Sequence, residues 1–329
     1  MKIERIAVIG GGAWGTALAQ VAATGGREVR LWAREAEVVD TINDAHTNPL
    51  FLPGIALSPS IRATGDLGEL DWADALLVVA PAQHVRTLLG SLPQGGRPLI
   101  LCSKGIEAGS MKLLTEVAAE AQPQAPIAVL SGPTFAHEVA QGLPTAITLA
   151  AADPALAEAL VARLAQPTFR PYASSDLIGA EIGGAVKNVL AIACGVVEGR
   201  GLGQNARAAL ISRGFAEMSR FGVARGARPE TLAGLSGLGD LVLTCSSQSS
   251  RNFSLGFGLG RGESAAALMA DRKTVAEGAF TAPVLREAAH TAGVEMPIVD
   301  AVCDLLDGSE KIDSVVEQML SRPLRTEGA

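Results

Sequence analysis

A glycine motif near the start of the chain constrains the fold more than any other feature. A short apolar run, Ile3 to Ile9, leads directly into Gly10-x-Gly12-x-x-Gly15, and a helical pattern from Trp14 to Ala23 and a strand pattern from Glu28 to Ala33 follow. In this context the glycines allow a tight turn and a close approach of the backbone to a pyrophosphate, whose charge the helix N-terminus stabilises. The motif predicts a βαβ unit that binds a dinucleotide, and a purely structural glycine turn is the weaker alternative.

The alternation of apolar runs and helical patterns continues through the first half of the chain. Apolar runs predict strands at Ala75–Ala80, Pro98–Cys102, Ile127–Leu130, Ala146–Ala150 and Phe169–Tyr172. Helical patterns begin after Ala82, Met111, Phe135 and Pro154. This order is typical of an α/β fold with a Rossmann-type, doubly wound and mostly parallel sheet.

The second half of the chain has a different pattern. Beyond residue 180 strand signals largely cease, and helices punctuated by glycine loops remain. A chain of 329 residues exceeds the usual size of one hydrophobic core, so we expect a dinucleotide-binding domain at 1–180 and a mainly α-helical substrate-binding domain at 181–329. The segment Ile182–Val197 is apolar on nearly all faces, which predicts a helix buried in the middle of the protein.

The charge of the chain restricts its partners. With a net charge of -7, its long-range field repels nucleic acid and anionic membranes, so a phosphate-bearing ligand needs a local cationic pocket. The sequence shows no signal-peptide pattern before the first strand and no apolar run suited to a membrane span. The four cysteines lie far apart without a C-x-x-C pattern. We expect a cytoplasmic protein with reduced thiols, no metal site and no stable membrane insertion.

The end of the second strand bears on the choice of cofactor. NAD-preferring enzymes commonly carry an acidic residue there, which hydrogen-bonds to the ribose 2′-hydroxyl. Here the region reads Leu31-Trp32-Ala33-Arg34, and an arginine fork can pair with the 2′-phosphate of NADP. Glu35 and Glu37 lie close by, and a solvated arginine at a helix start accounts for the same residue. The sequence therefore favours NADPH and is compatible with NADH.

Two lysines stand in places that point to chemistry. Lys104 follows a predicted strand, at the carboxyl end where ligands bind in open α/β sheets, although a solvated loop lysine fits the same position. Lys187 lies inside the apolar segment, where an ammonium group needs a partner, a ligand or a lowered pKa. A lowered pKa suits a general acid that works near neutral pH. The alternative is a structural ion pair with Glu181 or Asp240.

Three loops supply further polar groups. Ser131-Gly132-Pro133-Thr134-Phe135-Ala136 offers backbone amides and a hydroxyl at a helix start, and Thr134 can equally be a cap of that helix. Asp240 and Thr244 would share one helix face at i, i+4 spacing, although an N-cap role for Asp240 is the simpler alternative. Ser250-Arg251-Asn252 combines charge, fork geometry and amide donors suited to a phosphate, with a surface turn as the alternative.

Together these segments resemble the bacterial form of the NAD(P)-dependent glycerol-3-phosphate dehydrogenase family, nearly end to end. The matching segments are Gly10-Gly-Gly-Ala-Trp-Gly-Thr16, Asn48-Pro-Leu-Phe-Leu-Pro53, Ser103-Lys-Gly105, Gly132-Pro-Thr-Phe-Ala136, Gly184-Ala-Val-Lys-Asn188, Asn205-Ala-Arg-Ala-Ala-Leu210, Gly237-Leu-Gly-Asp240, Ser250-Arg-Asn252 and Val275-Ala-Glu-Gly278. The resemblance implies reversible hydride transfer between NAD(P)H and C2 of dihydroxyacetone phosphate, which gives sn-glycerol 3-phosphate for phospholipid synthesis. Lys187 would protonate the carbonyl oxygen, and Lys104 and Asp240 would polarise and orient that centre.

The resemblance also implies which residues form the two binding sites. Expected substrate-binding residues are Lys104, Gly132, Thr134, Lys187, Asn188, Asp240, Thr244, Ser250, Arg251 and Asn252. Expected cofactor-binding residues are Gly10, Gly12, Trp14, Gly15, Arg34, Lys104, Ala136, Arg251, Val275 and Glu277. Thr134 stands where many relatives have serine, a change that keeps the hydroxyl.

Two other functions compete with this interpretation. A hydroxy-acid dehydrogenase of the same two-domain build would leave Ser250-Arg251-Asn252 unexplained. A non-catalytic dinucleotide sensor keeps the fold without the chemistry, and the presence of both Lys187 and Asp240 argues against it. The expected partner is the small-molecule substrate, and a homodimer is compatible with the sequence.

Overall fold

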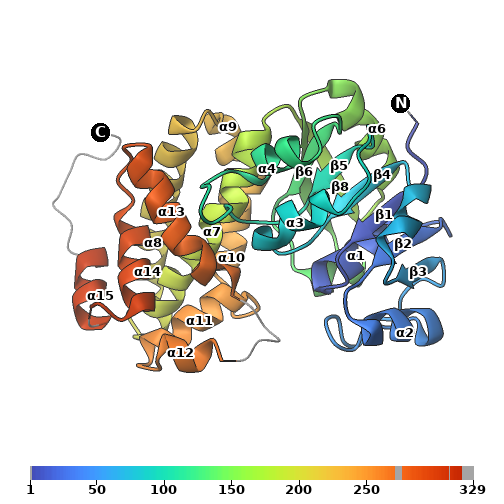
Figure 1. Ribbon diagram of the computed structural model, residues 1–329. Helices are drawn as coiled ribbons and strands as arrows, with labels where there is room; N and C mark the ends of the chain where they lie inside the picture. The colour runs from blue at the N-terminus through green and yellow to red at the C-terminus, as the bar shows by residue number, and fades with distance from the viewer. Residues whose placement is uncertain (1, 271–275, 311, 321–329) are drawn as a thin grey trace.

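A computed structural model of the chain describes residues 2–270, 276–310 and 312–320. Figure 1 shows a sheet with its covering helices on one side of the molecule and a purely helical part on the other. The strands are β1 (Ile6–Ile9), β2 (Val29–Trp32), β3 (Ile61–Thr64), β4 (Ala75–Val78), β5 (Leu99–Leu101), β6 (Ile127–Ser131), β7 (Thr145–Ala151) and β8 (Phe169–Ser174).

Helices of up to 11 residues connect the strands, and the helical part combines the long helices α7 and α8 with shorter ones. The helices between the strands are α1 (Ala13–Ala22), α2 (Ala36–Ala45), η1 (Leu67–Trp72), η2 (Ala82–His84), α3 (Val85–Gly90), α4 (Leu114–Ala121), α5 (Ala136–Ala140) and α6 (Pro154–Leu164). The helices after the last strand are α7 (Leu177–Gly199), α8 (Gly203–Ala224), α9 (Pro229–Leu232), η3 (Leu235–Gly239), α10 (Asp240–Cys245), α11 (Arg251–Gly260), α12 (Ala265–Leu268), α13 (Glu277–Thr291), α14 (Pro297–Asp307) and α15 (Ile312–Leu320).

The strand order of the sheet is β3-β2-β1-β4-β5-β6-β7-β8. Every neighbouring pair is parallel except β6 and β7, which confirms the predicted mostly parallel, doubly wound sheet. The carboxyl ends of β1, β4, β5 and β6 therefore meet at one edge, where open α/β sheets bind their ligands. The sequence pattern does not predict β3, because this four-residue edge strand carries an exposed arginine, Arg62, between two apolar residues.

The sheet is buried on both faces. Along β1, Ile6 and Val8 belong to the core beneath α1, whereas Ala7 and Ile9 belong to the core on the other face, beneath α3 and α4. A parallel strand that is covered on both faces reads as a continuous apolar run, because successive side chains point to opposite faces. This is why the short apolar runs of the sequence identify the central strands.

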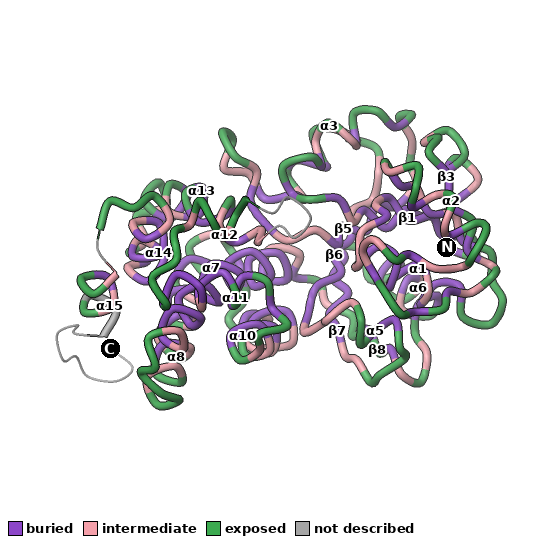
Figure 2. The backbone as a smooth tube through the Cα atoms, turned by 90° about the horizontal axis from the view of Figure 1, so that it is seen from below, coloured by how far each residue is buried: buried purple, intermediate pink, exposed green. Residues whose placement is uncertain are grey.

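Helix α7 is the core of the helical part. It contacts α8, α10, α11, α13 and α14 in the helical part, and it also contacts β6 and β7 of the sheet. Figure 2 shows this helix as buried along most of its length, which confirms the prediction for Ile182–Val197. Among the described residues it is the one helix long and apolar enough to cross a membrane, yet its apolar window is wholly buried inside the protein.

Helices α7 and α11 approach each other too closely for side chains at the crossing. A Cβ on Gly195 would lie 2.1 Å from the carbonyl oxygen of Phe253, and a Cβ on Gly256 would lie 1.9 Å from that of Ile192. Glycine inside a helix costs about 1 kcal/mol relative to alanine, so tight packing explains why it stands here. The packing holds the start of α11 beside the middle of α7.

Candidate active site

The turn between β1 and α1 has the geometry expected of a pyrophosphate site. Gly10 has φ +127°, and a Cβ there would lie 2.8 Å from the carbonyl oxygen of Val79. A Cβ on Gly15 would lie 1.9 Å from the carbonyl oxygen of Gly10, so Gly15 lets α1 pack against the turn. Nothing lies within 4 Å of a Cβ built on Gly12, the N-cap of α1. This open side leaves room for an anion at the first N–H groups of α1, and Trp14 lies partly buried in that first turn.

A buried asparagine supports this turn from behind. Asn48 is fully buried, and its side-chain amide donates to the carbonyl oxygen of Gly11 and to Oγ1 of Thr16, both at 2.8 Å. Its Oδ1 accepts a hydrogen bond from the N–H of Phe51 at 3.2 Å. The sequence alone gives Asn48 no structural role. A polar residue in the apolar segment Asn48–Pro53 is the signal that marks it.

The end of β2 presents the arginine expected at the cofactor ribose. Arg34 is exposed, and its guanidinium pairs with Oε1 of Glu35 at 2.7 Å. An exposed pair of this kind contributes little to stability, so the fork can exchange the carboxylate for a phosphate at little cost. Both interpretations of Arg34, as a ligand for the 2′-phosphate and as a residue at a helix start, fit this position.

A carboxylate and two lysines meet between the sheet and the helical part. Nζ of Lys104, which follows β5, donates to Oδ2 of Asp240 at 2.7 Å and to the carbonyl oxygen of Gly132 at 3.3 Å. Nζ of Lys187, on α7, donates to Oδ1 of Asp240 at 2.5 Å and to Oγ1 of Thr244 at 2.8 Å. The three charged side chains are 15%, 6% and 0% exposed for Lys104, Lys187 and Asp240. We call Lys104, Lys187, Asp240 and Thr244 the active-site cluster.

Burial and the neighbouring charges set the protonation of Lys187. Burial lowers the pKa of Lys187 to about 8, Asp240 acts against this shift, and the Lys104 ammonium reinforces it. A lysine with this pKa exchanges its proton near neutral pH. Of the two carboxylates considered as partners, Asp240 makes the contact, whereas Glu181 accepts hydrogen bonds from the backbone N–H and hydroxyl of Thr115. The ion pair and the lowered pKa are therefore both present.

Two glycines of α7 make room for the cluster. A Cβ on Gly184 would lie 3.2 Å from Cγ of Lys104 and 3.0 Å from Oγ of Ser131. A Cβ on Gly183 would lie 2.1 Å from the carbonyl oxygen of Ser236, in the turn that precedes Asp240. The glycine pair thus lets the loop after β5 and the turn before α10 both reach Lys187. Ser131 Oγ is buried and has no hydrogen-bond partner among the described residues.

Two simpler interpretations of the sequence are wrong in the structure. The hydroxyl of Thr134 donates to the carbonyl oxygen of Gly132 at 3.3 Å, and the N-cap of α5 is Phe135, so Thr134 does not cap that helix. The N-cap of α10 is Gly239, and the carboxylate of Asp240 binds the lysines instead of backbone N–H groups. Ala136 is partly buried at the start of α5.

The start of α11 lies beside Lys187 through a pair of amides. Nδ2 of Asn252 donates to Oδ1 of Asn188 at 3.0 Å, and its Oδ1 accepts from the N–H of Gly278 at 2.9 Å. Ser250 caps α11 by accepting a hydrogen bond from the N–H of Phe253 at 3.3 Å. Arg251, the first residue of α11, is exposed. The structure thus connects the expected phosphate-binding segment to the residue next to Lys187.

Glu277, the first residue of α13, is a carboxylate near the active-site cluster. Burial raises the pKa of Glu277, and the positive charges of Arg251, Lys104 and Lys187 act in the opposite direction. These interactions place Glu277 within the field of the same cationic groups. Val275, the other cofactor residue expected from this segment, lies outside the described residues. No group of three or more His, Cys, Asp or Glu side chains suited to a metal ion occurs in the part of the chain that the structure describes.

Comparisons with known proteins agree with this geometry. Residues 5–157 match the sequence model of the NAD-dependent glycerol-3-phosphate dehydrogenase N-terminus, and residues 176–317 match that of its C-terminus. The chain is 64% identical over 321 residues to glycerol-3-phosphate dehydrogenase (NAD(P)+) 1 of Sphingopyxis alaskensis, which covers 98% of this chain and 97% of the relative. The crystal structure of glycerol-3-phosphate dehydrogenase from Coxiella burnetii has a TM-score of 0.93 at 38% identity, and the match covers 98% and 99% of the two chains.

A hydroxy-acid enzyme is a more distant structural neighbour. The structure of D-mandelate dehydrogenase matches with a TM-score of 0.65 at 14% identity and covers 94% of this chain and 99% of that one. Identity at this level shows a shared fold and nothing about substrate.

Proposed function

This chain belongs to the NAD-dependent glycerol-3-phosphate dehydrogenase family, and we propose that Lys104, Lys187 and Asp240 carry the chemistry of its reaction. It is an NAD(P)-dependent oxidoreductase that interconverts dihydroxyacetone phosphate and sn-glycerol 3-phosphate, a precursor for phospholipid synthesis. The observation that carries the assignment of residues is the position of one buried carboxylate, that of Asp240, between two lysine ammonium groups.

The turn after β1 fits the nicotinamide dinucleotide that such an enzyme uses. Gly12 has open space where a Cβ would stand, and the helix that follows it has no side chain capping its N-terminus. Gly10, Gly12, Trp14 and Gly15 would hold the cofactor there, with Ala136, Glu277 and Val275 as further contacts, and the bound cofactor supplies or takes up the hydride.

The lysines supply the proton and stabilise the charge that forms on oxygen. Reduction of a ketone leaves negative charge on the carbonyl oxygen, and Lys187 gives that oxygen a proton. A pKa of about 8 allows Lys187 to act as acid in this direction and as base in the reverse one. Lys104 donates a hydrogen bond to the same oxygen, and Asp240 holds both ammonium groups in place. With two ammonium groups and one carboxylate, the active-site cluster has a surplus of positive charge, which favours an anionic substrate and a developing oxyanion.

The phosphate group of the substrate needs its own cationic site, because the net charge of the protein is -7. Arg251 and Asn252 supply a guanidinium fork and an amide at the start of α11, with Ser250 beside them. The hydrogen bond between Asn252 and Asn188 fixes this segment next to Lys187. Gly132, Thr134 and Thr244 line the same region from the loop after β6 and from α10, and we assign them to substrate binding.

Arg34 supports a preference for NADPH over NADH, because its exposed guanidinium follows β2, where the cofactor ribose binds in this fold. We further propose a cytoplasmic homodimer without stable membrane insertion. We also keep the division into 1–180 and 181–329, which falls within the first turns of α7.

Oxidation of NADPH and of NADH, followed by the absorbance of the reduced nicotinamide, tests this function. Dihydroxyacetone phosphate should be reduced rapidly, unphosphorylated dihydroxyacetone should not, and NADPH should be the better cofactor. The Arg251→Ala variant should raise the KM for the phosphorylated ketone, since it removes a phosphate ligand. Equal rates of cofactor oxidation with the phosphorylated and unphosphorylated ketones would rule out Arg251 as the phosphate ligand. If neither ketone caused oxidation, the hydroxy-acid dehydrogenase and the non-catalytic sensor would again be the leading alternatives.

A further inference from the structure

Lys104 differs from the other charged members of the active-site cluster in having no helix to hold it. Lys187 lies in the middle of α7 and Asp240 begins α10, whereas Lys104 belongs to the irregular segment between β5 and α4. Gly105 has φ +149° and Met111 has φ +56°, so this segment departs from regular backbone on both sides of its tip. The position of the Lys104 ammonium group therefore depends on contacts that fix this segment.

The segment is closed on itself beyond Lys104. Ile106 and Leu113 form an isolated antiparallel bridge, and the N–H of Glu107 donates to the carbonyl oxygen of Lys112 at 3.0 Å. These contacts make 106–113 a small closed loop. Its buried residues Ile106 and Leu113 pack in the core of the helical part, and hydrogen bonds from the segment after β4 attach it to the sheet side.

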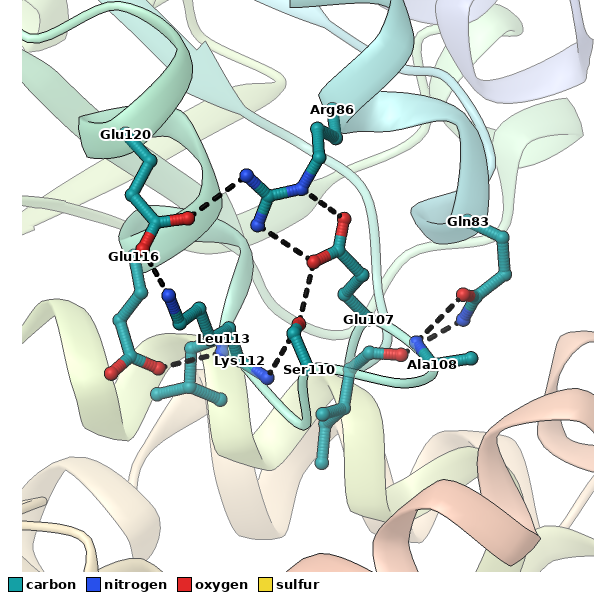
Figure 3. A network of polar contacts seen from close by, with 10 residues as sticks. Gln83, Arg86, Glu107, Ala108, Ser110, Lys112, Leu113, Glu116 and Glu120 are labelled. Atoms are coloured by element: carbon teal, nitrogen blue, oxygen red, sulfur yellow. Dashed lines mark hydrogen bonds and ion pairs between the residues drawn. The ribbon is translucent and has the colours of Figure 1, made fainter.

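Gln83, in η2 after β4, provides the attachment on the sheet side (Figure 3). Its Nε2 donates to the carbonyl oxygen of Ile106 at 2.8 Å, and its Oε1 accepts from the N–H of Ala108 at 2.9 Å. One side-chain amide thus spans three residues of the loop and begins two residues after Lys104. The neighbouring Arg86 adds a two-pronged contact with Glu107, with both N–O distances at 2.8 Å.

Close packing passes this restraint on to Lys104. A Cβ on Gly105 would lie only 2.8 Å from Cβ of Ala82, so the backbone between Lys104 and the loop lies against η2. Directly before Lys104, the hydroxyl of Ser103 donates to the carbonyl oxygen of Ala80 at 2.5 Å. The segment after β4 therefore holds Lys104 from both sides, through Ser103 on one and through Gln83 on the other.

We propose that Gln83 is a positioning residue for the reaction, which acts by fixing the loop 106–113 directly after Lys104, so that the Lys104 ammonium group stays within reach of Asp240. The proposal rests on the role proposed above for Lys104. Gln83 is itself exposed, so its hydrogen bonds add little to the stability of the fold. Its effect should therefore appear in catalysis, where a displacement of about 1 Å can cost roughly 100-fold in rate.

A double-mutant cycle between Gln83 and Lys104 tests the proposal. Gln83→Met keeps the length of the side chain and removes both hydrogen bonds, and it should lower kcat/KM for dihydroxyacetone phosphate by about 10- to 100-fold. In a Lys104→Ala background the same change should cost nothing further, because the group it positions is absent. Gln83→Glu keeps the acceptor for Ala108 and loses the donor for Ile106, so its activity should lie between those of the wild type and Gln83→Met.

The matched control is Gln94→Met. Gln94 donates one hydrogen bond, at 2.9 Å, to the carbonyl oxygen of Ala121 at the end of α4, away from the cluster. It should leave kcat/KM unchanged, and both methionine variants should retain wild-type urea unfolding midpoints and NADPH affinity. A full-sized loss from Gln83→Met in the Lys104→Ala background would overturn the proposal, and so would the absence of any loss in the wild type. Wild-type kcat/KM for Lys104→Ala alone would instead overturn the role of Lys104 on which it rests.

Discussion

Two groups of charged residues meet at the segment after β5, one through Lys104 and the other through Glu107. Their contact distances are nearly the same, but the groups differ in burial. In the active-site cluster Lys104 contacts Asp240 at 2.7 Å, and in the network of Figure 3 Arg86 contacts Glu107 at 2.8 Å. Asp240 is fully buried, whereas the Arg86 side chain is 39% exposed. Since the energy of a charge pair depends on the surrounding dielectric as much as on distance, equal geometry here has unequal consequences.

The two groups also differ in their balance of charge. The network of Arg86, Glu107, Lys112 and Glu120, which we call the loop network, contains two cations and two carboxylates. Its hydrogen bonds from Arg86 lower the pKa of Glu107, which keeps that carboxylate ionised. The active-site cluster has one carboxylate for two lysines, and burial lowers the pKa of one of them, Lys187, to about 8. We therefore assign proton transfer near neutral pH to the buried group and a structural role to the exposed group, as a proposal that the following variants test.

The largest effect should come from removing the ammonium group of Lys187. Lys187→Ala should lower turnover with dihydroxyacetone phosphate by about 100- to 10,000-fold, the usual contribution of a positioned general acid. The affinity for NADPH should stay nearly intact, because the role proposed for Lys187 is in proton transfer and not in cofactor binding. Lys112→Ala, which removes a lysine of the loop network, is the control and should keep normal turnover. Near-normal turnover of Lys187→Ala would show that the active-site cluster is no more important for proton transfer than the loop network.

Removal of a carboxylate from each group should give unequal losses of stability. Asp240→Asn leaves two ammonium groups without their shared partner in a buried site, and breaking a buried pair in this way costs about 3–5 kcal/mol. Glu107→Gln breaks a pair whose arginine is partly solvated, so its loss should be much smaller. Urea unfolding of the two variants measures the difference. Equal midpoints would show that burial of Asp240 does not set the strength of the cluster.

The sequence predicts the sheet part better than the helical part, for a physical reason. The glycine motif at Gly10 and the apolar runs of the central strands are local signals, since a turn and a strand depend on neighbouring residues. The close crossing of α7 and α11 at Gly195 and Gly256 is a contact between distant segments, and a single glycine in a helical pattern does not reveal it. The sequence predicts that Ile182–Val197 is buried but not which helices cover it.

The candidate site shows the same division. An ammonium group inside an apolar helix marks Lys187 from sequence alone, because burial of an unpaired charge is costly. The sequence leaves the choice between Glu181 and Asp240 as its partner open, because Asp240 is 53 residues away and only the fold brings it to Lys187. Asn48 and Gln83 act through hydrogen bonds to backbone groups of other segments. The apolar surroundings of Asn48 mark it in the sequence, but no local pattern predicts the hydrogen-bond partners of either residue.

Glu181 is a second buried carboxylate, and it differs from Asp240 because its hydrogen-bond donors belong to Thr115 and not to a lysine. It is 6% exposed, and burial raises its pKa from 4.5 to about 7. Because the folded-state pKa is the higher one, its contribution to stability is full below pH 4.5 and is lost as the pH rises through 7. Glu181→Gln stays neutral throughout, so its free energy of unfolding relative to wild type should rise between pH 5 and pH 8, by up to about 3 kcal/mol. Parallel curves for the two proteins over this range would contradict the raised pKa.

The smallest effect, and the most specific, is on the pH dependence of the reaction. In the role proposed for Lys187, reduction of the ketone needs its protonated form, so kcat/KM should fall as the pH rises through its pKa of about 8. The charge of Asp240 raises this pKa and that of Lys104 lowers it. Asp240→Asn should therefore move the fall in activity to lower pH and Lys104→Met should move it to higher pH, each by roughly one unit or more. The two variants remove opposite charges from the same ammonium group, so shifts in the same direction would assign the titration to a residue outside the cluster.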